Sequence, residues 1–380
     1  MAREGQPGQL SVRSCYTASV RHIGIVGAGI AGLTVAFRRS LRGDRISLYE
    51  ASPRLGGQLH TERSEGFLVE HGAEGFIAGS TALAELAAAT GLASQLVDQE
   101  VTETCTFDGN QLLRLAPGEA GKMLGFQVGP RAFGKGIQSF SGGMSQIVEA
   151  LQRRLGPHST CLPNTPIQTL RRRGNRWEML LESGSAIEVD AVVVATSAAA
   201  AARLLSAAFG SLASALADSP ALSSVSVSLA YPRQAIAHQL DATGFVVAEG
   251  AQIEGLRACT FASSKLRGRA LPQLALLRLF FRPTEQDLDM NDAGWISRAE
   301  RCAKRVLGID GPASHHWVSR WVRALPVFDA EHRERVDRLE AHLRHTGVSL
   351  AGAGFHGAGI DGAVRSAEAA ARALDAEPYA

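Results

Sequence analysis

This sequence contains few cysteines, few lysines and little net charge, and each shortage argues against a class of site or partner. Its five cysteines lie far apart, and none forms a Cys-x-x-Cys or Cys/His ligand spacing. That argues against structural zinc and suits a reducing compartment. Lysine is scarce, with four residues that could supply an amine (Lys122, Lys135, Lys265 and Lys304). Neither sign of charge dominates, and a formal net charge of +2 favours neither nucleic acid nor an anionic membrane as a partner.

The chain also lacks an obvious targeting or membrane segment. Residues 1–20 have no apolar stretch of the kind found in signal peptides, and we predict a disordered leader there. Residues 191–209 carry little charge, but a β-branched half followed by an alanine-rich half indicates a strand and then a helix. We therefore expect a soluble, cytoplasmic protein whose contact with a membrane is at most peripheral. Its 380 residues are enough for two domains, or for one domain interrupted by another.

A nucleotide-binding fingerprint stands near the beginning. The apolar run "RHIGIV" precedes Gly27-Ala28-Gly29-Ile30-Ala31-Gly32, a helical pattern and the strand-like "RISLYE", which ends at Glu50. In such a unit Gly27 permits a tight turn, Gly29 lets the backbone approach a pyrophosphate, and Gly32 allows close packing of the helix. Glu50 lies where an acid accepts hydrogen bonds from a ribose, which disfavours NADP.

The following stretch, "EASPRLGGQLHTERSEGFLVEHGAEGF", distinguishes FAD from NAD. Its paired glycines suit a loop that passes along an extended diphosphate. Here the sequence resembles FAD enzymes of the amine-oxidase and protoporphyrinogen-oxidase group, whose signature is Glu-x-x-x-Arg-x-Gly-Gly followed by a Gly-Ala or Gly-Pro turn. The matching residues are Glu50, Arg54, Gly56, Gly57, Gly72 and Ala73, with Gln58 where the family often has a basic residue. The resemblance implies non-covalently bound FAD.

The resemblance also implies the fold: an α/β protein with a Rossmann-like FAD-binding domain of the glutathione-reductase type and a substrate domain. Residues 222–321 contain short strand-like runs and one helical pattern, which favours an antiparallel sheet with helices. We predict a discontinuous FAD-binding domain from residues 21–80, 140–221 and 322–380. Residues 81–139, a shortened helical region, and 222–321 would form the substrate domain.

A second Gly-x-Gly-x-x-Gly spacing occurs at Gly352, Gly354 and Gly357, close to the C-terminus. A second nucleotide domain needs a complete strand–helix–strand unit and a ribose acid, and too few residues follow. Both glycine motifs are therefore predicted to serve one cofactor. By resemblance, Ala358, Gly359 and Ile360 lie against the flavin. A helix beginning near Asp361 would direct its positive end toward the charge that develops on flavin reduction.

Two further cofactor contacts implied by the resemblance have structural alternatives. Ile167 would touch the adenine or would simply be a core residue, and Trp321 would lie near the flavin or in the core. The complete set of predicted cofactor residues is Gly27, Ala28, Gly29, Ile30, Ala31, Gly32, Glu50, Arg54, Gly56, Gly57, Gln58, Gly72, Ala73, Ile167, Ala195, Thr196, Trp321, Gly352, Ala358, Gly359 and Ile360.

The first functional hypothesis is an oxidase resembling protoporphyrinogen oxidases, with a small-molecule tetrapyrrole precursor as substrate and oxygen as acceptor. The flavin carries such chemistry, so we name no catalytic side chain and no metal ligand. The predicted substrate-binding residues are Ile77, Thr243, Gly244, Val246, Leu279, Phe280 and His356. Two departures weaken the match. Residues 116–138 are too few for the family's long helical insertion, and Ile77 and Ala78 stand where a basic residue is common.

Two alternatives remain open. An amine or specialised-metabolite oxidase or desaturase would use the same flavin on another substrate, although the aromatic pair typical of amine oxidases is not evident. A flavin-retaining interaction protein without turnover would also keep the glycine motifs. The sequence does not define the oligomeric state.

Overall fold

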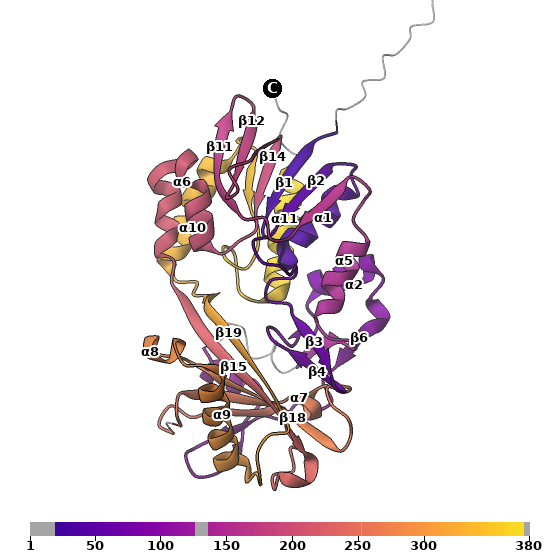
Figure 1. The fold of residues 1–380 in the computed structure, drawn as a ribbon, viewed down its shortest axis with the longest axis vertical. Helices are drawn as coiled ribbons and strands as arrows, with labels where there is room; N and C mark the ends of the chain where they lie inside the picture. Colours follow the sequence, from indigo (N-terminus) through magenta and orange to yellow (C-terminus); the bar gives the residue numbers. More distant parts are fainter. Residues whose placement is uncertain (1–19, 126–135, 252, 376–380) are drawn as a thin grey trace, which may run out of the picture.

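The computed structural model describes residues 20–125, 136–251 and 253–375. Nearly all of the predicted leader, and residues 126–135 of the shortened helical region, lie outside the described residues. The described chain forms two bodies joined by long strands (Figure 1). One body carries the N- and C-terminal segments, and the middle of the sequence builds the other.

The first body is organised on a five-stranded parallel sheet in the order β10-β2-β1-β14-β20. The strands are β1 (His22–Val26), β2 (Arg45–Tyr49), β10 (Ser159–Leu162), β14 (Ala191–Val194) and β20 (Val348–Leu350). Both β1 and β14 are buried on both faces, as expected for apolar strands between two layers. This strand order is that of a nucleotide-binding fold, and it confirms the predicted fold class.

Layers on the two sides of this sheet bury it. The first layer comprises α1 (Ile30–Ser40), α2 (Thr81–Thr90), α5 (Ser145–Arg153) and α11 (Gly359–Ala373). The second comprises the antiparallel meander β11 (Ile167–Arg173), β12 (Arg176–Leu181) and β13 (Ala186–Val189), with α6 (Ala198–Ser214), the 3-10 helix η2 (Ala215–Asp218) and α10 (Ala330–Leu343). The predicted strand and helix of residues 191–209 are confirmed.

Helix α6 is the one helix of the described residues that is long and apolar enough to cross a membrane when it is counted together with η2. Over Ala198–Asp218 its mean hydropathy is 1.4, and a third of the window is buried. Gly210 has non-helical backbone angles inside this segment, so the helix is interrupted there.

The second body contains a seven-stranded sheet in the order β19-β15-β18-β17-β16-β7-β8. Its strands are β7 (Cys105–Phe107), β8 (Leu112–Arg114), β15 (Ala221–Pro232), β16 (Gly244–Val247), β17 (Leu256–Phe261), β18 (Leu274–Phe281) and β19 (His315–Pro326). All of its pairings are antiparallel except β7 with β16. Helix α9 (Asp292–Leu307) covers one face through Trp295, Ala299 and Cys302. The short helices α3 (Glu119–Met123), η3 (Arg233–Ala235), α7 (Ala262–Lys265) and α8 (Glu285–Leu288) lie in the connections.

Smaller elements lie between the two bodies. A hairpin of β3 (Thr61–Ser64) and β4 (Phe67–Glu70) is followed by the small sheet β5-β9-β6, formed by Phe76–Ile77, Ile137–Phe140 and Leu96–Asp98. The 3-10 helix η1 (Ala93–Gln95) precedes β6.

The packing differs from the predicted domain boundaries in three places. Phe67 and Val69 of β4, assigned to the FAD-binding domain, pack against Ala230 and Leu276 of the seven-stranded sheet. Helix α2, assigned to the substrate domain, belongs to the core around α1 and α11. Strand β19 runs without a break through the predicted boundary at residue 321. In the first two cases, apolar residues are buried in a core that the predicted boundaries assigned to the other domain.

Candidate functional site

The first glycine turn has the geometry expected for a dinucleotide cradle. Gly27 has a φ of +98°, and a Cβ there would lie 2.5 Å from the carbonyl oxygen of Ala195. A Cβ on Gly32 would lie 1.9 Å from the carbonyl oxygen of Gly27, so this glycine lets helix α1 approach its own turn. Gly29 is different, since a Cβ there would meet no atom within 4 Å. The side of Gly29 on which a Cβ would lie is therefore open.

Glu50 closes this turn from the end of β2. One carboxylate oxygen accepts the backbone N–H of Ala28 at 2.8 Å, and the other accepts that of Ser52 at 2.9 Å. Each oxygen keeps a further lone pair. The acid is thus held beside the turn and can still accept hydrogen bonds from ribose hydroxyls.

The paired glycines lie directly against the first turn. The N–H of Gly56 donates to the carbonyl of Ala28 at 2.8 Å, and a Cβ on Gly57 would lie 3.2 Å from the Cα of Gly29. Arg54 supports this loop, because its guanidinium donates to the carbonyls of Leu55, Gly57 and Leu59. The structure therefore gives Arg54 a role in shaping the loop.

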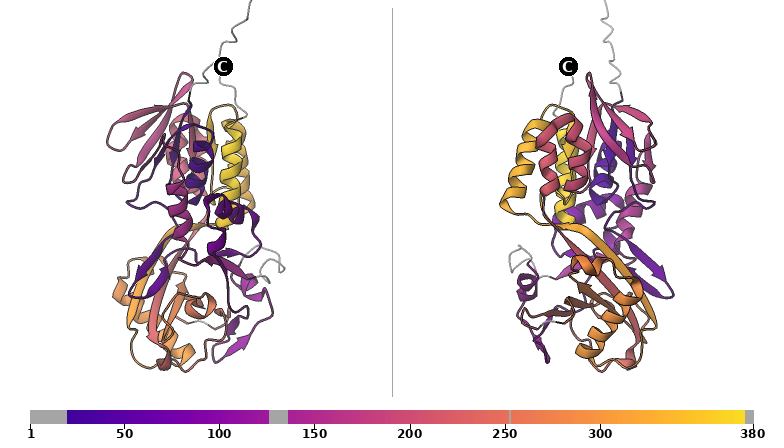
Figure 2. Two further views of the ribbon diagram at one scale, coloured as in Figure 1. Left: turned by 90° about the vertical axis from the view of Figure 1, so that its right-hand side faces the viewer. Right: turned by 60° about the vertical axis from the view of Figure 1, so that its left-hand side comes forward.

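The C-terminal glycine motif reaches the same place. A Cβ on Gly352 would lie 3.3 Å from the Cβ of Ala31, and one on Gly354 would lie 3.1 Å from the carbonyl oxygen of Thr196. Figure 2 shows α11 in yellow alongside the indigo N-terminal unit. Helix α11 has Ala358 at its N-cap, with no side-chain cap, and a Cβ on the preceding Gly357 would meet no atom within 4 Å.

Four chain segments therefore meet along one path: the first glycine turn, the paired glycines, the end of β14 and the turn after β20. Backbone groups, one acid and open glycine positions line it, as an elongated dinucleotide requires. The residues present fit a flavin dinucleotide.

The Gly72–Ala73 turn connects this path to the second body. A Cβ on Gly72 would lie 1.7 Å from the carbonyl oxygen of Gln58, which also accepts the N–H of Ala73 at 3.2 Å. The Gln58 amide donates to the carbonyl of Ala324 on β19 at 2.7 Å. Gln58 thus holds the glycine loop against β19.

The predicted substrate residues do not share one surface. Cross-strand register places Val246, Ala258, Phe280, Ser226 and Ser319 in one row. From this face of the sheet, Ser319 reaches His71 of the first body.

Leu279 lies on the other face. It is fully buried in the core that α9 covers, so the prediction that it lines the substrate slot is wrong. Thr243 is also buried, and its hydroxyl pairs with that of Thr104 at 2.8 Å. A Cβ on Gly244 would lie 2.0 Å from the carbonyl oxygen of Cys259, which accounts for this glycine by strand packing. Alternation along β18 separates Leu279 from Phe280, whereas Gly244 has the same parity as Val246 on β16 and is accounted for by its close approach to Cys259.

Four other predicted contacts have distinct surroundings. Ile77 is half-buried on β5. The His356 ring lies 2.7 Å from the carboxylate of Glu340 on α10, and this hydrogen bond raises the pKa of His356. The ring is therefore engaged by α10, which argues against the predicted substrate contact. Ile167 is buried in the core with Trp177 and Met179, as its structural alternative stated. The indole N–H of Trp321 donates to the carbonyl of His71 at 2.7 Å.

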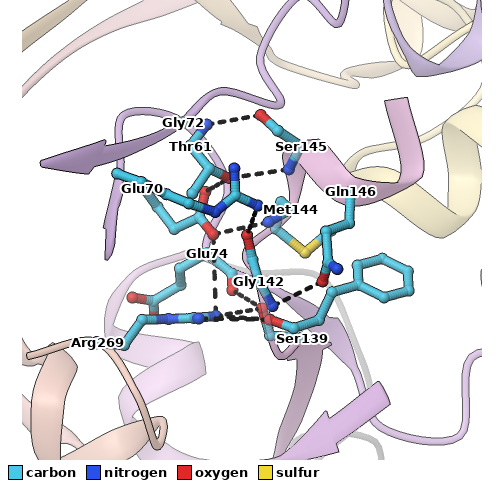
Figure 3. A network of polar contacts seen from close by, with 12 residues as sticks. Thr61, Glu70, Gly72, Glu74, Ser139, Gly142, Met144, Ser145, Gln146 and Arg269 are labelled. Atoms are coloured by element: carbon cyan, nitrogen blue, oxygen red, sulfur yellow. Dashed lines mark hydrogen bonds and ion pairs between the residues drawn. The ribbon is translucent and has the colours of Figure 1, made fainter. Parts of the chain in front are cut away.

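A cluster of buried charges, which sequence reasoning missed, lies between the bodies (Figure 3). Glu70 accepts hydrogen bonds from the N–H of Met144 and the hydroxyl of Thr61, both at 2.8 Å. Burial nevertheless raises its pKa, since the guanidinium of Arg269 remains 3.9 Å away. Burial also acts to raise the pKa of Glu74, but the paired ammonium of Lys265 outweighs it and the pKa is lowered.

Two histidines, His60 and His71, follow the loop that contains Gly56 and Gly57. The rings of His60 and His71 stack with centroids 4.4 Å apart. Burial, with the nearby Arg54, lowers the pKa of His60 to about 4, and burial also lowers that of His71. Both rings are expected to be neutral at pH 7. Their positions in a polar stretch gave no sequence signal for this contact.

Comparison with known proteins identifies two family matches along the chain. Residues 101–375 match the family described as flavin-containing amine oxidoreductases, and residues 25–90 match an NAD(P)-binding Rossmann-like domain. The coproporphyrinogen III oxidase of Propionibacterium freudenreichii is 25% identical and is matched over 92% of this chain and 90% of its own length. That of Bacillus subtilis is 22% identical over 92% and 97%.

Solved structures with the same fold include a protein from Exiguobacterium whose assignment as a protoporphyrinogen oxidase is itself provisional. Its TM-score is 0.82, with 21% identity, 95% of this chain covered and 100% of that chain. Putrescine oxidase bound to putrescine has a TM-score of 0.68, with 16% identity and coverage of 94% and 99%.

The alignment with the Propionibacterium oxidase spans 481 positions, whereas this chain has 380 residues. Because about 350 residues of this chain are aligned, roughly 130 of these positions have no residue of this chain opposite them. The Propionibacterium oxidase therefore has segments that do not align with this chain.

Proposed function

Because this oxidoreductase belongs to the flavin-containing amine oxidoreductase family, we propose that it binds FAD non-covalently and oxidises a porphyrinogen with oxygen as the acceptor. The observation that carries the proposal is the convergence of both glycine motifs on one path, with Gly352 against Ala31. One elongated dinucleotide is the ligand that such a path suits. Bound FAD would supply the redox chemistry, by accepting hydride equivalents from a substrate C–H bond.

The residues of this chain would position that cofactor. Glu50 would accept hydrogen bonds from the ribose, and the open side of Gly29 would admit the pyrophosphate beside the N-terminus of α1. The free N–H groups in the first turn of α11 would stabilise negative charge on the flavin ring. The C-terminal glycine motif contains no cysteine, and His356 within it is paired with Glu340, which supports non-covalent binding.

The substrate class rests on two kinds of support. The curated relatives quoted above, which this chain matches over nearly their whole length, are named for coproporphyrinogen III oxidation. On the sheet face toward the first body, Phe280 is apolar and partly exposed, which suits contact with a flat macrocycle, whereas Val246 of the same row is buried. We therefore propose coproporphyrinogen III or protoporphyrinogen IX as substrate.

The test begins with the visible spectrum of the purified protein and its FAD content after denaturation. Porphyrinogen is then added without oxygen, and the flavin band at about 450 nm is expected to bleach. Readmission of air should restore the band and yield fluorescent porphyrin together with hydrogen peroxide.

Other outcomes would replace the proposal. Bleaching by putrescine or another amine, but not by porphyrinogen, would assign an amine oxidase. Retained FAD that no candidate substrate reduces would favour a flavin-retaining protein without turnover. Absence of FAD from the folded protein, even after incubation with excess cofactor, would overturn the cofactor assignment itself.

A further inference from the structure

Three side chains of the seven-stranded sheet, here called the substrate sheet, contact one turn, His71–Gly72, two of them through its backbone and one through the His71 ring. Arg278 of β18 donates to the carbonyl of Gly72 at 2.6 Å and to that of His71 at 2.8 Å. Trp321 of β19 donates to the same His71 carbonyl at 2.7 Å. The hydroxyl of Ser319 lies 2.8 Å from the His71 ring. The second body thereby holds this turn at four points.

Neighbouring side chains hold the guanidinium of Arg278 in the position that these hydrogen bonds require. Its side chain is 4% exposed, lies 4.7 Å from the centre of the Phe280 ring, and donates to the hydroxyl of Ser226 from Nε and Nη2 at 3.2 and 3.0 Å. Ser226 is itself buried. The planar guanidinium thus joins one sheet anchor to two adjacent carbonyls, an arrangement that the single ammonium of a lysine cannot reproduce.

A single residue, Gln58, lies between the His71–Gly72 turn and the glycines that line the proposed cofactor path. Gly72 has no room for a Cβ against the carbonyl of Gln58, and Gly57, the neighbour of Gln58, packs on Gly29. A shift of the turn would therefore displace the glycine loop. The same turn also meets the substrate sheet, so its position sets the cofactor relative to the substrate.

We propose that Arg278 is a positioning residue. It fixes the His71–Gly72 turn to the substrate sheet, and through that turn it fixes the loop that contains Gly56 and Gly57, here called the cofactor loop. This inference rests on the proposed function in so far as FAD is the ligand of the loop. Arg278 acts through backbone carbonyls, and no contact between Arg278 and the cofactor is invoked.

The test measures the dissociation constant of FAD for folded full-length apoprotein. Arg278→Met is expected to weaken FAD binding about tenfold or more, because hydrogen bonds from a charged donor are lost. Arg278→Lys should recover only part of the affinity. Arg282→Met, at an exposed position just beyond β18, is the matched control and should bind FAD as the wild type does.

Ser226→Ala keeps the test decisive if Arg278→Met fails to fold. It removes the anchor of Arg278 and is expected to weaken FAD binding about threefold. Unfolding of each apoprotein is measured in parallel, since a purely structural role would lower stability without changing the affinity of the folded fraction. Wild-type affinity in folded Arg278→Met, or in Ser226→Ala, would overturn the inference. Wild-type protein that takes up no FAD would instead overturn the proposed function.

Discussion

Gly29 and Gly32 lie three residues apart in one turn, yet they are glycine for different reasons. A methyl group at Gly29 would meet nothing in the protein, whereas one at Gly32 would collide with the carbonyl oxygen of Gly27. Gly29→Ala is therefore expected to change the unfolding free energy of the apoprotein by less than about 0.5 kcal/mol. It should weaken FAD binding about tenfold or more, since the methyl fills the space for the pyrophosphate.

Gly32→Ala is the contrasting variant. It should destabilise the apoprotein by about 3 kcal/mol, because the backbone of the turn must move. Urea unfolding of the apoproteins, followed by fluorescence titration with FAD, measures both quantities. Equal loss of stability in the two variants would show that Gly29 is a packing glycine and would remove the argument for a ligand beside it.

The ion pair Glu74–Lys265, whose side chains are 18% and 13% exposed, yields a prediction about pH. In the wild type the ammonium and neighbouring arginines hold the pKa of Glu74 below its usual value despite burial. The pair's contribution is thus present above the unfolded pKa of about 4.5 and is lost as the pH falls through the folded pKa. Lys265→Met leaves the buried carboxylate without its ammonium partner, and should cost about 3 kcal/mol at pH 7.

In Lys265→Met, the contribution of Glu74 to the pH dependence of stability has the opposite sign. Without the ammonium, burial raises the pKa of this carboxyl, so the variant gains stability as acidification protonates it. The stability difference between wild type and variant should be largest at neutral pH. It should begin to narrow above pH 4.5, as the variant's Glu74 is protonated, and narrow further below about pH 4.5, where the wild type loses stability. Urea unfolding from pH 4 to 7.5 measures it, with the exposed Lys304→Met as control. A difference that does not depend on pH would contradict this account.

At the level of the elements, Gly244 is required by the pairing of β16 with β17, and we do not assign it a contact with the substrate. Its φ is +143°, and a Cβ would lie 2.0 Å from the carbonyl oxygen of Cys259 on the paired strand β17. Gly244→Ala should therefore destabilise the protein by about 3 kcal/mol by separating β16 from β17. Gly250→Ala, where a Cβ meets nothing, should be neutral. Thermal unfolding compares the two, and unchanged stability of Gly244→Ala would restore a role at the substrate.

The local sequence pattern predicted where strands and helices lie, but it did not predict which face of a strand is buried or which element packs against it. The short strands expected in residues 222–321 are present as β15 to β19, because alternation and β-branched side chains are properties of one segment. The face of Leu279 was wrong because both neighbours, Arg278 and Phe280, lie on the other face, and an apolar run gives no register. The packing of α2 on α11 was missed for a similar reason: its partner residues are about 280 positions away in the chain.

For the whole molecule, the sequence predicted the meeting of its two ends because glycine spacing reports directly on close backbone approach. Gly29, Gly57 and Gly352 lie as that argument requires. The charge cluster around Glu74 and Arg278 could not be predicted in this way. Its members come from two stretches that are distant in the chain, residues 70–74 and 265–278, and the local pattern of either stretch does not show that they meet. Only the docking of the substrate sheet on the β3–β4 hairpin brings them together.

That convergence gives a prediction for the intact chain, because one cofactor and two nucleotides would protect different backbone segments. A single FAD should slow amide hydrogen exchange in residues 26–32, 54–59 and 352–362 together, at one equivalent per chain. Residues 256–261 of β17, within the other body, serve as the internal control and should change little. Unfolding stability should rise by about 1.4 kcal/mol for each tenfold excess of FAD over its dissociation constant. Protection of residues 26–32 by FAD with none at residues 352–362, or uptake of two equivalents, would mean that the terminal glycine motif serves another ligand.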